Sequence, residues 1–101
     1  MTEREKQSKF LRMLAHLINY ATAQGYEFTG GDLWSKPEYN AHSKNSFHYR
    51  RLAIDLNLFR DGHYCESTED HAPLGLYWES LGGTWGGRFK NPDGNHYSLG
   101  E

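Results

Sequence analysis

Hydrophobic residues in the first quarter of the chain recur three or four positions apart, which is the spacing of one face of a helix. Phe10, Leu14, Leu17 and Ala21 belong to this series. They predict an amphipathic helix from about Glu3 to Gln24, with Gly25 as its C-terminal stop. Residues 26–29 then have the composition of a strand. The polar segment 30–46 is a long loop for so small a domain and is expected to form one wall of a functional cleft.

The middle of the chain has the alternating pattern of a half-buried strand over residues 52–59. Leu52, Ile54, Leu56 and Leu58 point to one face, and Asp55 points to the other. Asp61-Gly62 follows directly and is a strong signal for a two-residue hairpin turn. Residues 63–66 are therefore expected to return antiparallel, with Cys65 as a small buried residue.

The last third of the sequence predicts a second helix, a glycine-rich segment, a turn and a short strand. Ser67 and Asp70 are spaced as a capping box, and Gly82-Gly83 ends the helix. Residues 84–89 lack the lysine and flanking elements of a phosphate-binding loop, so we expect a tightly packed loop that presents Trp85 to the cleft. Residues 91–95 form a turn before the strand-like run 96–99. The helix should face the sheet with four apolar side chains: Leu74, Tyr77, Trp78 and Leu81.

Four residues form the set that a mononuclear zinc hydrolase needs. His48, Asp55 and His96 supply three candidate ligands, which leaves a fourth position for water. Asp93 is the candidate base that takes a proton from that water and passes it to the leaving group. His48 and Asp55 are an odd number of residues apart, so the chain must turn or bulge around residues 49–51 if both are to reach one ion.

Two motifs in this set resemble those of zinc peptidases of the D-alanyl-D-alanine carboxypeptidase and L-alanyl-D-glutamate endopeptidase family. Ser46–Leu56 resembles the S-x-H-x(6)-D motif, and Asp93–His96 resembles the D/E-x-x-H motif. The family includes VanX and VanY type enzymes and small phage endolysins. The resemblance implies an α+β fold with a small antiparallel sheet and flanking helices, of the hedgehog/DD-peptidase type. It also implies Zn²⁺ as the cofactor, held by His48, Asp55 and His96, with Asp93 as the catalytic acid/base.

The chain departs from the family pattern at three places. Arg51 stands where the family usually has glycine, and Ser98 stands where many relatives have an acidic residue. The substrate-binding arginine that usually follows an aromatic residue is missing, since Trp34 is followed by Ser35-Lys36. Lysine lacks the planar pair of donors that binds a carboxylate bidentately. The residues expected to contact substrate are Ser46, Lys36, Arg50, Arg51 and Trp85.

The function that the resemblance implies is hydrolysis of an amide bond in the peptide stem of bacterial peptidoglycan. An L-alanyl-D-glutamate endopeptidase of the phage endolysin type is the leading prediction. The alternatives are a D-alanyl-D-alanine carboxypeptidase of the same family, or a non-catalytic, metal-stabilised domain that binds cell-wall peptide. The remaining histidines, His16, His42, His63 and His71, have no ligand partner at motif spacing and are expected to be flank, loop or turn residues.

Composition and charge limit the number of domains and the kinds of partner that are expected. The 101 residues fit one domain, and we expect residues 1–101 to be a single monomeric catalytic unit. The formal net charge of -2 gives no basic stripe for duplex nucleic acid, which is therefore not an expected partner. The charged N-terminus predicts neither a signal peptide nor a stable membrane insertion. We expect synthesis in the cytoplasm, followed by action on the wall after release through a holin-type pore or as part of a virion.

Overall fold

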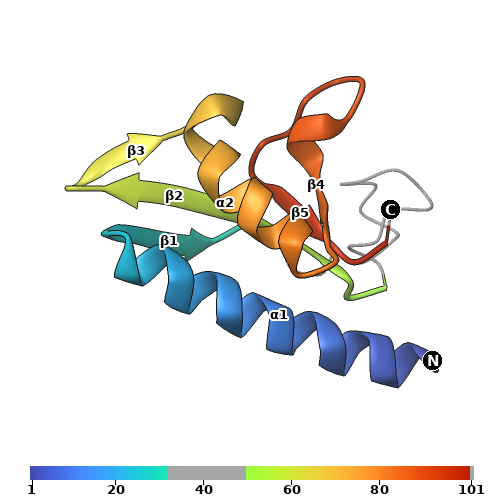
Figure 1. The fold of residues 1–101 in the computed structure, drawn as a ribbon. Coiled ribbons are helices and arrows are strands. Elements are labelled where there is room, and N and C mark those ends of the chain that lie inside the picture. Colours follow the sequence, from blue (N-terminus) through green and yellow to red (C-terminus); the bar gives the residue numbers. More distant parts are fainter. Residues whose placement is uncertain (32–49, 101) are drawn as a thin grey trace.

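Two α-helices cover one face of a small antiparallel sheet in the computed structural model, which describes residues 1–31 and 50–100 (Figure 1). β2 is the central strand, and the strand order is β1-β2-β5-β4, with β3 paired to β2 as well. The predicted α+β class is confirmed. The elements in chain order are α1 (Glu3–Ala23), β1 (Tyr26–Gly30), β2 (Ala53–Arg60), β3 (His63–Cys65), α2 (Thr68–Ser80), β4 (Thr84–Trp85), the 3-10 turn η2 (Gly86–Arg88) and β5 (His96–Ser98).

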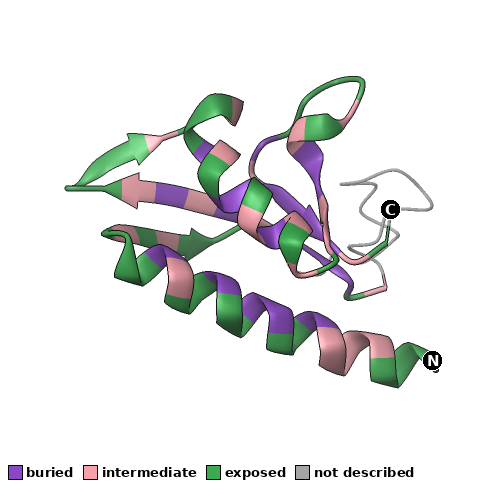
Figure 2. Cartoon of the chain, in the orientation of Figure 1, coloured by how far each residue is buried: buried purple, intermediate pink, exposed green. Residues whose placement is uncertain are grey.

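The core lies between the helices and the sheet. α1 presents one continuous buried stripe to the strands, as Figure 2 shows. Phe10 of α1 meets Trp78 of α2 edge to face, with 5.8 Å between ring centroids. Trp78 in turn meets Tyr97 of β5 at 5.9 Å, so one aromatic chain joins both helices to the sheet. The predicted helices are therefore confirmed as core elements.

None of the helices in the described part of the chain is long and apolar enough to span a membrane.

Local sequence signals set the ends of these elements. Thr2 caps α1 through a reciprocal capping box with Glu5, and Gly25 follows the helix with φ of 89°. Asp61 and Gly62 have φ of 52° and 78°, and Arg60 pairs with His63 across the strands. These are the positive angles of a two-residue type I′ turn, so the predicted hairpin is confirmed.

The alternation predicted for residues 52–59 is also confirmed. Ile54, Leu56 and Leu58 are buried against the helices, whereas Asp55 and Asn57 are half-buried on the other face. Strand β2 begins at Ala53, one residue later than predicted. The important consequence is that the side chain of Asp55 projects from the centre of the sheet, away from the helices.

Arg51 adopts a backbone conformation that favours glycine. Residues 50–51 form a turn immediately before β2, and Arg51 has φ of 59°. This agrees with the turn or bulge predicted around residues 49–51, of which the structure describes residues 50–51. A residue with a Cβ atom is strained in the left-handed region, so glycine would suit this position better than arginine does. Arg51 thus has a backbone conformation that is typical of glycine, although its side chain is large.

Glycine at position 51 should therefore stabilise the fold. We expect Arg51→Gly to have a free energy of unfolding up to about 1 kcal/mol higher than Arg51→Ala, because the relief of strain exceeds the added chain entropy of glycine. The alanine variant is the matched control, since both changes remove the same arginine side chain. Urea unfolding of the two variants measures the difference, and equal midpoints with equal slopes would contradict this explanation.

Candidate metal centre

Asp55 and His96 face each other across the central strands. β2 and β5 are antiparallel, and these two residues are direct partners in their register. The neighbouring Leu56 N–H donates to the Asn95 carbonyl at 2.8 Å, which makes Asp55 and His96 a non-hydrogen-bonded pair. Side chains approach each other most closely at such pairs. The Nδ1 atom of His96 lies 3.4 Å from Oδ1 of Asp55, and the His96 side chain is only 6% exposed.

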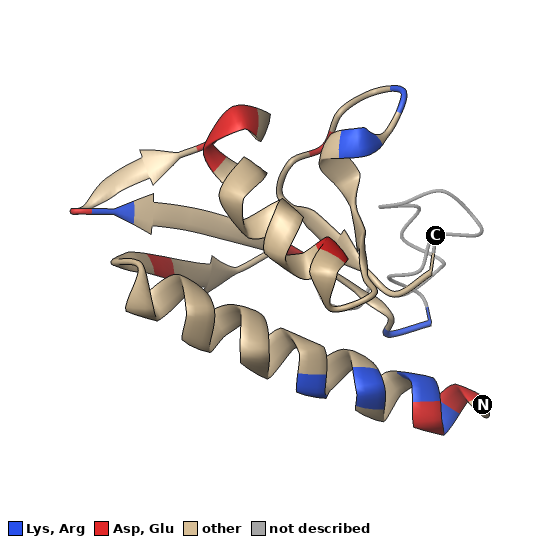
Figure 3. Cartoon of the chain, viewed as in Figure 1, with Lys and Arg blue, Asp and Glu red and all other residues tan. Residues whose placement is uncertain are grey.

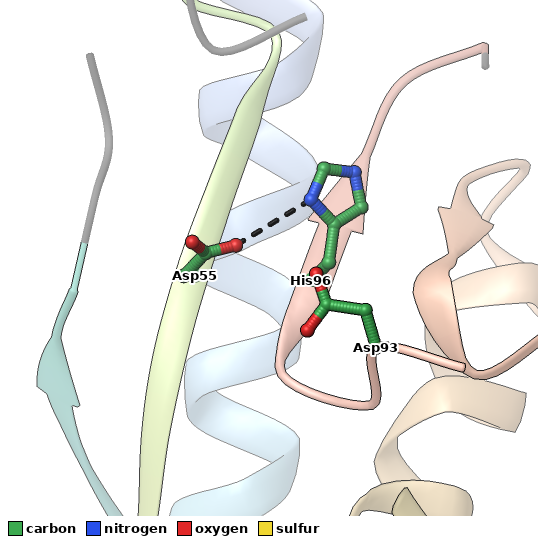
Figure 4. Close-up of side chains that lie close together, drawn as sticks. All are labelled: Asp55, Asp93 and His96. Atoms are coloured by element: carbon green, nitrogen blue, oxygen red, sulfur yellow. Dashed lines mark ion pairs between the residues drawn. The ribbon is translucent and has the colours of Figure 1, made fainter. Parts of the chain in front are cut away.

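Asp93 reaches the same place from the turn that precedes β5. Its N–H donates to the Gly86 carbonyl at 2.9 Å, and its carbonyl accepts the N–H of His96 at 3.1 Å. One potential ligand atom from each of Asp55, Asp93 and His96 lies within 4.8 Å of the others. Figure 4 shows the three side chains converging from β2, β5 and the turn. Asp93 is the exposed member of the group, so it is the one most accessible to water or substrate.

This cluster lies on the face of the sheet opposite the helices. In Figure 4, α1 runs behind the strands that carry Asp55 and His96. The burial pattern agrees, because Ile54 and Leu56 on either side of Asp55 are in the core. The ring of Phe89 packs against His96 with 5.3 Å between centroids. A rigid strand pair and an aromatic neighbour therefore hold the imidazole, while the helices leave this face to other segments.

The donor set fits a zinc ion. Imidazole nitrogen and carboxylate oxygen are both common zinc ligands. Two such atoms bound at about 2.0–2.1 Å in a tetrahedral site lie about 3.4 Å apart, which agrees with the separation of His96 Nδ1 and Asp55 Oδ1. Asp55 and His96 would thus serve as ligands without rearrangement of the strands. His48, the third predicted ligand, lies outside the described residues.

The residues predicted to contact substrate have different surroundings. Ser46 and Lys36 lie outside the described part of the chain. The Arg50 guanidinium binds Glu3 of α1 through two contacts, with Nη2–Oε1 at 2.6 Å and Nε–Oε2 at 3.2 Å. Hydrogen bonding to Arg50 is the main cause that lowers the pKa of Glu3. Arg51 occupies the strained turn beside Arg50.

The prediction that a loop presents Trp85 to the cleft is wrong. Residues 84–85 form the edge strand β4, paired with β5, and Trp85 is a core residue that is 5% exposed. Its indole N–H donates to the Gly94 carbonyl at 2.8 Å. Large aromatic side chains near glycines are typical of both exposed loops and close packing, and here the glycines admit the ring into the core.

The sequence analysis missed a buried polar pair behind the site. Nδ1 of His71, on α2, lies 2.7 Å from the hydroxyl of Tyr97, the residue that follows His96. His71 is only 1% exposed, and burial lowers its pKa to about 4. Burial also raises the pKa of the Tyr97 hydroxyl, so its proton is available to the neutral imidazole. His71 follows Asp70 in the first turn of a helix, and no local signal in the sequence distinguished it from an exposed histidine.

Charged side chains are spread over several elements of the described part of the chain. Figure 3 shows lysine and arginine on the N-terminal half of α1 and at turns and strand ends. Several are neutralised by nearby acids, as Arg50 is by Glu3 and Arg88 is by Glu79. In the described ranges, no basic stripe crosses the sheet face that carries Asp55.

Comparison with known proteins identifies the family. None of the curated proteins matches the sequence. The fold resembles the crystal structure of the Serratia marcescens L-Ala D-Glu endopeptidase ChiX, with a TM-score of 0.72 and 15% identity, over 97% of this chain and 86% of that chain. At this identity the likeness shows a shared fold. A family described as D-alanyl-D-alanine carboxypeptidase matches residues 39–99. Because that match spans more than half of the chain and includes Asp55, Asp93 and His96, the chain belongs to the D-alanyl-D-alanine carboxypeptidase family that its motifs indicated.

Proposed function

We propose that this chain is a zinc-dependent peptidase that hydrolyses an amide bond in the peptide stem of bacterial peptidoglycan. The observation that carries the proposal is the convergence of Asp55, Asp93 and His96 within 4.8 Å on the sheet face opposite α1 and α2. Family membership supports peptide hydrolysis, and the likeness to an L-Ala D-Glu endopeptidase favours that bond among those in the stem.

The roles of the residues follow from their positions. Asp55 and His96, on paired strands, would hold the metal together with His48. A bound zinc ion would lower the pKa of a water molecule and polarise the scissile carbonyl. Asp93 would take the proton from the attacking water and then donate it to the leaving amine as the carbon–nitrogen bond breaks. Its exposed position on the turn leaves the carboxylate open to water and to substrate.

The second candidate function is removal of a terminal D-alanine, which the family description favours. A carboxypeptidase must recognise a free carboxylate, for which arginine is the best suited side chain. Arg50 is already bound to Glu3 in a two-contact ion pair. This pairing supports the endopeptidase over the carboxypeptidase.

Product analysis by mass spectrometry tests the function. The zinc-loaded protein is incubated with Gram-negative peptidoglycan fragments, beside a chelator-treated sample. Release of defined peptides that the chelator prevents is the expected result, and the fragment masses identify the bond. Loss of D-alanine alone would favour the carboxypeptidase. Intact substrate beside a protein with stoichiometric zinc would overturn the enzyme proposal in favour of a wall-peptide binding domain.

The place of action is also part of the proposal. Action on the peptide stem requires access to the cell wall, and we propose that a phage-type protein reaches it through a holin-type pore or within a virion. Addition of the purified protein to intact and to permeabilised Gram-negative cells tests this requirement. Lysis of permeabilised cells alone is expected for the pore route.

A further inference from the structure

The indole of Trp85 supports the turn that carries Asp93. Trp85 is almost fully buried, with its ring against Gly75 of α2 and Gly87 of η2. Its Nε1–H donates to the carbonyl of Gly94, the residue next to Asp93, at 2.8 Å. The turn therefore receives a hydrogen bond from a side chain that is almost completely shielded from bulk solvent.

Glycines fix the position of this ring. A Cβ atom placed on Gly75 of α2 would lie 2.1 Å from Cδ2 of Trp85, and one placed on Gly87 would lie 2.3 Å from Cζ2. Both distances are far shorter than any van der Waals contact, so the backbone of each glycine lies directly against the indole. The ring has little freedom to shift, and its N–H remains directed at Gly94.

The next residue holds the other side of the turn. The Gly86 carbonyl accepts the N–H of Asp93 at 2.9 Å. A Cβ on Gly86 would lie 2.2 Å from the Asp93 carbonyl oxygen and 2.8 Å from Cβ of His96. A Cβ on Gly94 would similarly lie 2.5 Å from Cα of Thr68. Trp85 thus binds the carbonyl of Gly94, and Gly86 binds the N–H of Asp93. These two consecutive residues hold the Asp93 backbone on both sides.

We infer that Trp85 is a positioning residue for Asp93. Its indole N–H fixes the turn so that the Asp93 carboxylate stays beside Asp55 and His96, without itself touching the substrate. The inference rests on the proposed function in that Asp93 is taken as the base. Catalytic groups must be held to within about 0.5 Å, and a displacement of about 1 Å can lower a rate about 100-fold.

Trp85→Phe is the test variant, because it keeps an aromatic ring in the core and removes only the N–H and part of the bulk. Trp78→Phe is a closely matched control. Trp78 is also fully buried beside a glycine, and its Nε1–H also donates to a backbone carbonyl, that of Ser98, at 2.8 Å. Both variants lose one buried hydrogen bond and similar ring volume, but only Trp85 contacts the Asp93 turn.

Two measurements separate positioning from general stability. The first is amide hydrogen exchange of the Asp93 and His96 N–H groups in the metal-free protein, at a temperature where both variants are folded. We expect Trp85→Phe to lower the protection of both amides about tenfold or more, and Trp78→Phe to leave it within about twofold. The second is steady-state hydrolysis of stem peptide. There we expect Trp85→Phe to lower kcat about tenfold with an unchanged KM, and Trp78→Phe to keep the wild-type kcat.

The outcomes distinguish this inference from the proposed function. Equal losses of kcat in the two variants, or a wild-type kcat in Trp85→Phe, would overturn the positioning role. If the wild-type protein hydrolyses no stem peptide, the proposed function fails, and hydrogen exchange alone then decides whether Trp85 holds the turn. Unchanged exchange in Trp85→Phe would overturn that part too.

Discussion

Replacing Asp93 with asparagine should lower kcat for stem-peptide hydrolysis by about 10²–10⁴-fold, the usual contribution of a general acid/base. Asparagine has nearly the shape of aspartate but cannot accept and return a proton. Asp93 is exposed, whereas Asp55 and His96, the two proposed ligands on the strands, are more buried. Zinc should therefore remain bound at one equivalent. Steady-state kinetics with zinc-loaded protein, together with metal analysis, measures both quantities.

Two further variants make this result specific. His96→Ala removes a proposed ligand and should abolish both zinc binding and hydrolysis. Asp70→Asn removes an exposed carboxylate from the first turn of α2 and should leave kcat unchanged. Full activity in Asp93→Asn would show that the mechanism proposed for this residue is wrong. Loss of zinc from Asp93→Asn would instead make Asp93 a ligand.

Much of the candidate site could be predicted because local sequence patterns determine where the strand and the turn lie and which way their side chains point. The alternation around Asp55 determines that its side chain points away from the core, and that prediction needed only the period of a strand. The turn residues before His96 were equally recognisable. What the pattern could not give is the register that places Asp55 opposite His96, since it depends on pairing between segments 41 residues apart in the sequence. The motif resemblance supplied that missing connection.

Trp85 shows why the rest was not predictable. Its neighbours Gly86 and Gly87 are compatible with an exposed loop and with close packing, and the local sequence does not distinguish between the two. The deciding residue is Gly75, on a different element, whose missing side chain opens the space for the indole. Burial of this kind is a property of tertiary packing. Local sequence therefore led to the prediction that Trp85 contacts substrate, whereas its indole is buried and donates to the Gly94 carbonyl.

His71 is the source of the second large effect, a loss of stability in mild acid. Its pKa is lowered from 6.5 to about 4 because burial disfavours the imidazolium. Between these values the unfolded chain binds a proton that the folded protein does not, so the free energy of unfolding falls as the pH falls. The full contribution of neutral His71 to the free energy of unfolding is present above about pH 6.5 and is lost as the pH approaches 4. From the two pKa values we expect a loss of about 2 kcal/mol between pH 7 and 5.

Urea unfolding of the zinc-free protein at pH 7 and at pH 5 measures this loss. His71→Gln, which keeps a polar group near the Tyr97 hydroxyl, should be less stable than the wild type at pH 7 but should lose about 2 kcal/mol less on acidification. His16→Gln changes an exposed histidine of α1 and should retain the wild-type pH dependence. If His71→Gln and the wild type lose equal stability, His71 is protonated in the folded protein at pH 5. Its contact with Tyr97 would then have to survive with a charged imidazole, which the 1% exposure of His71 makes costly.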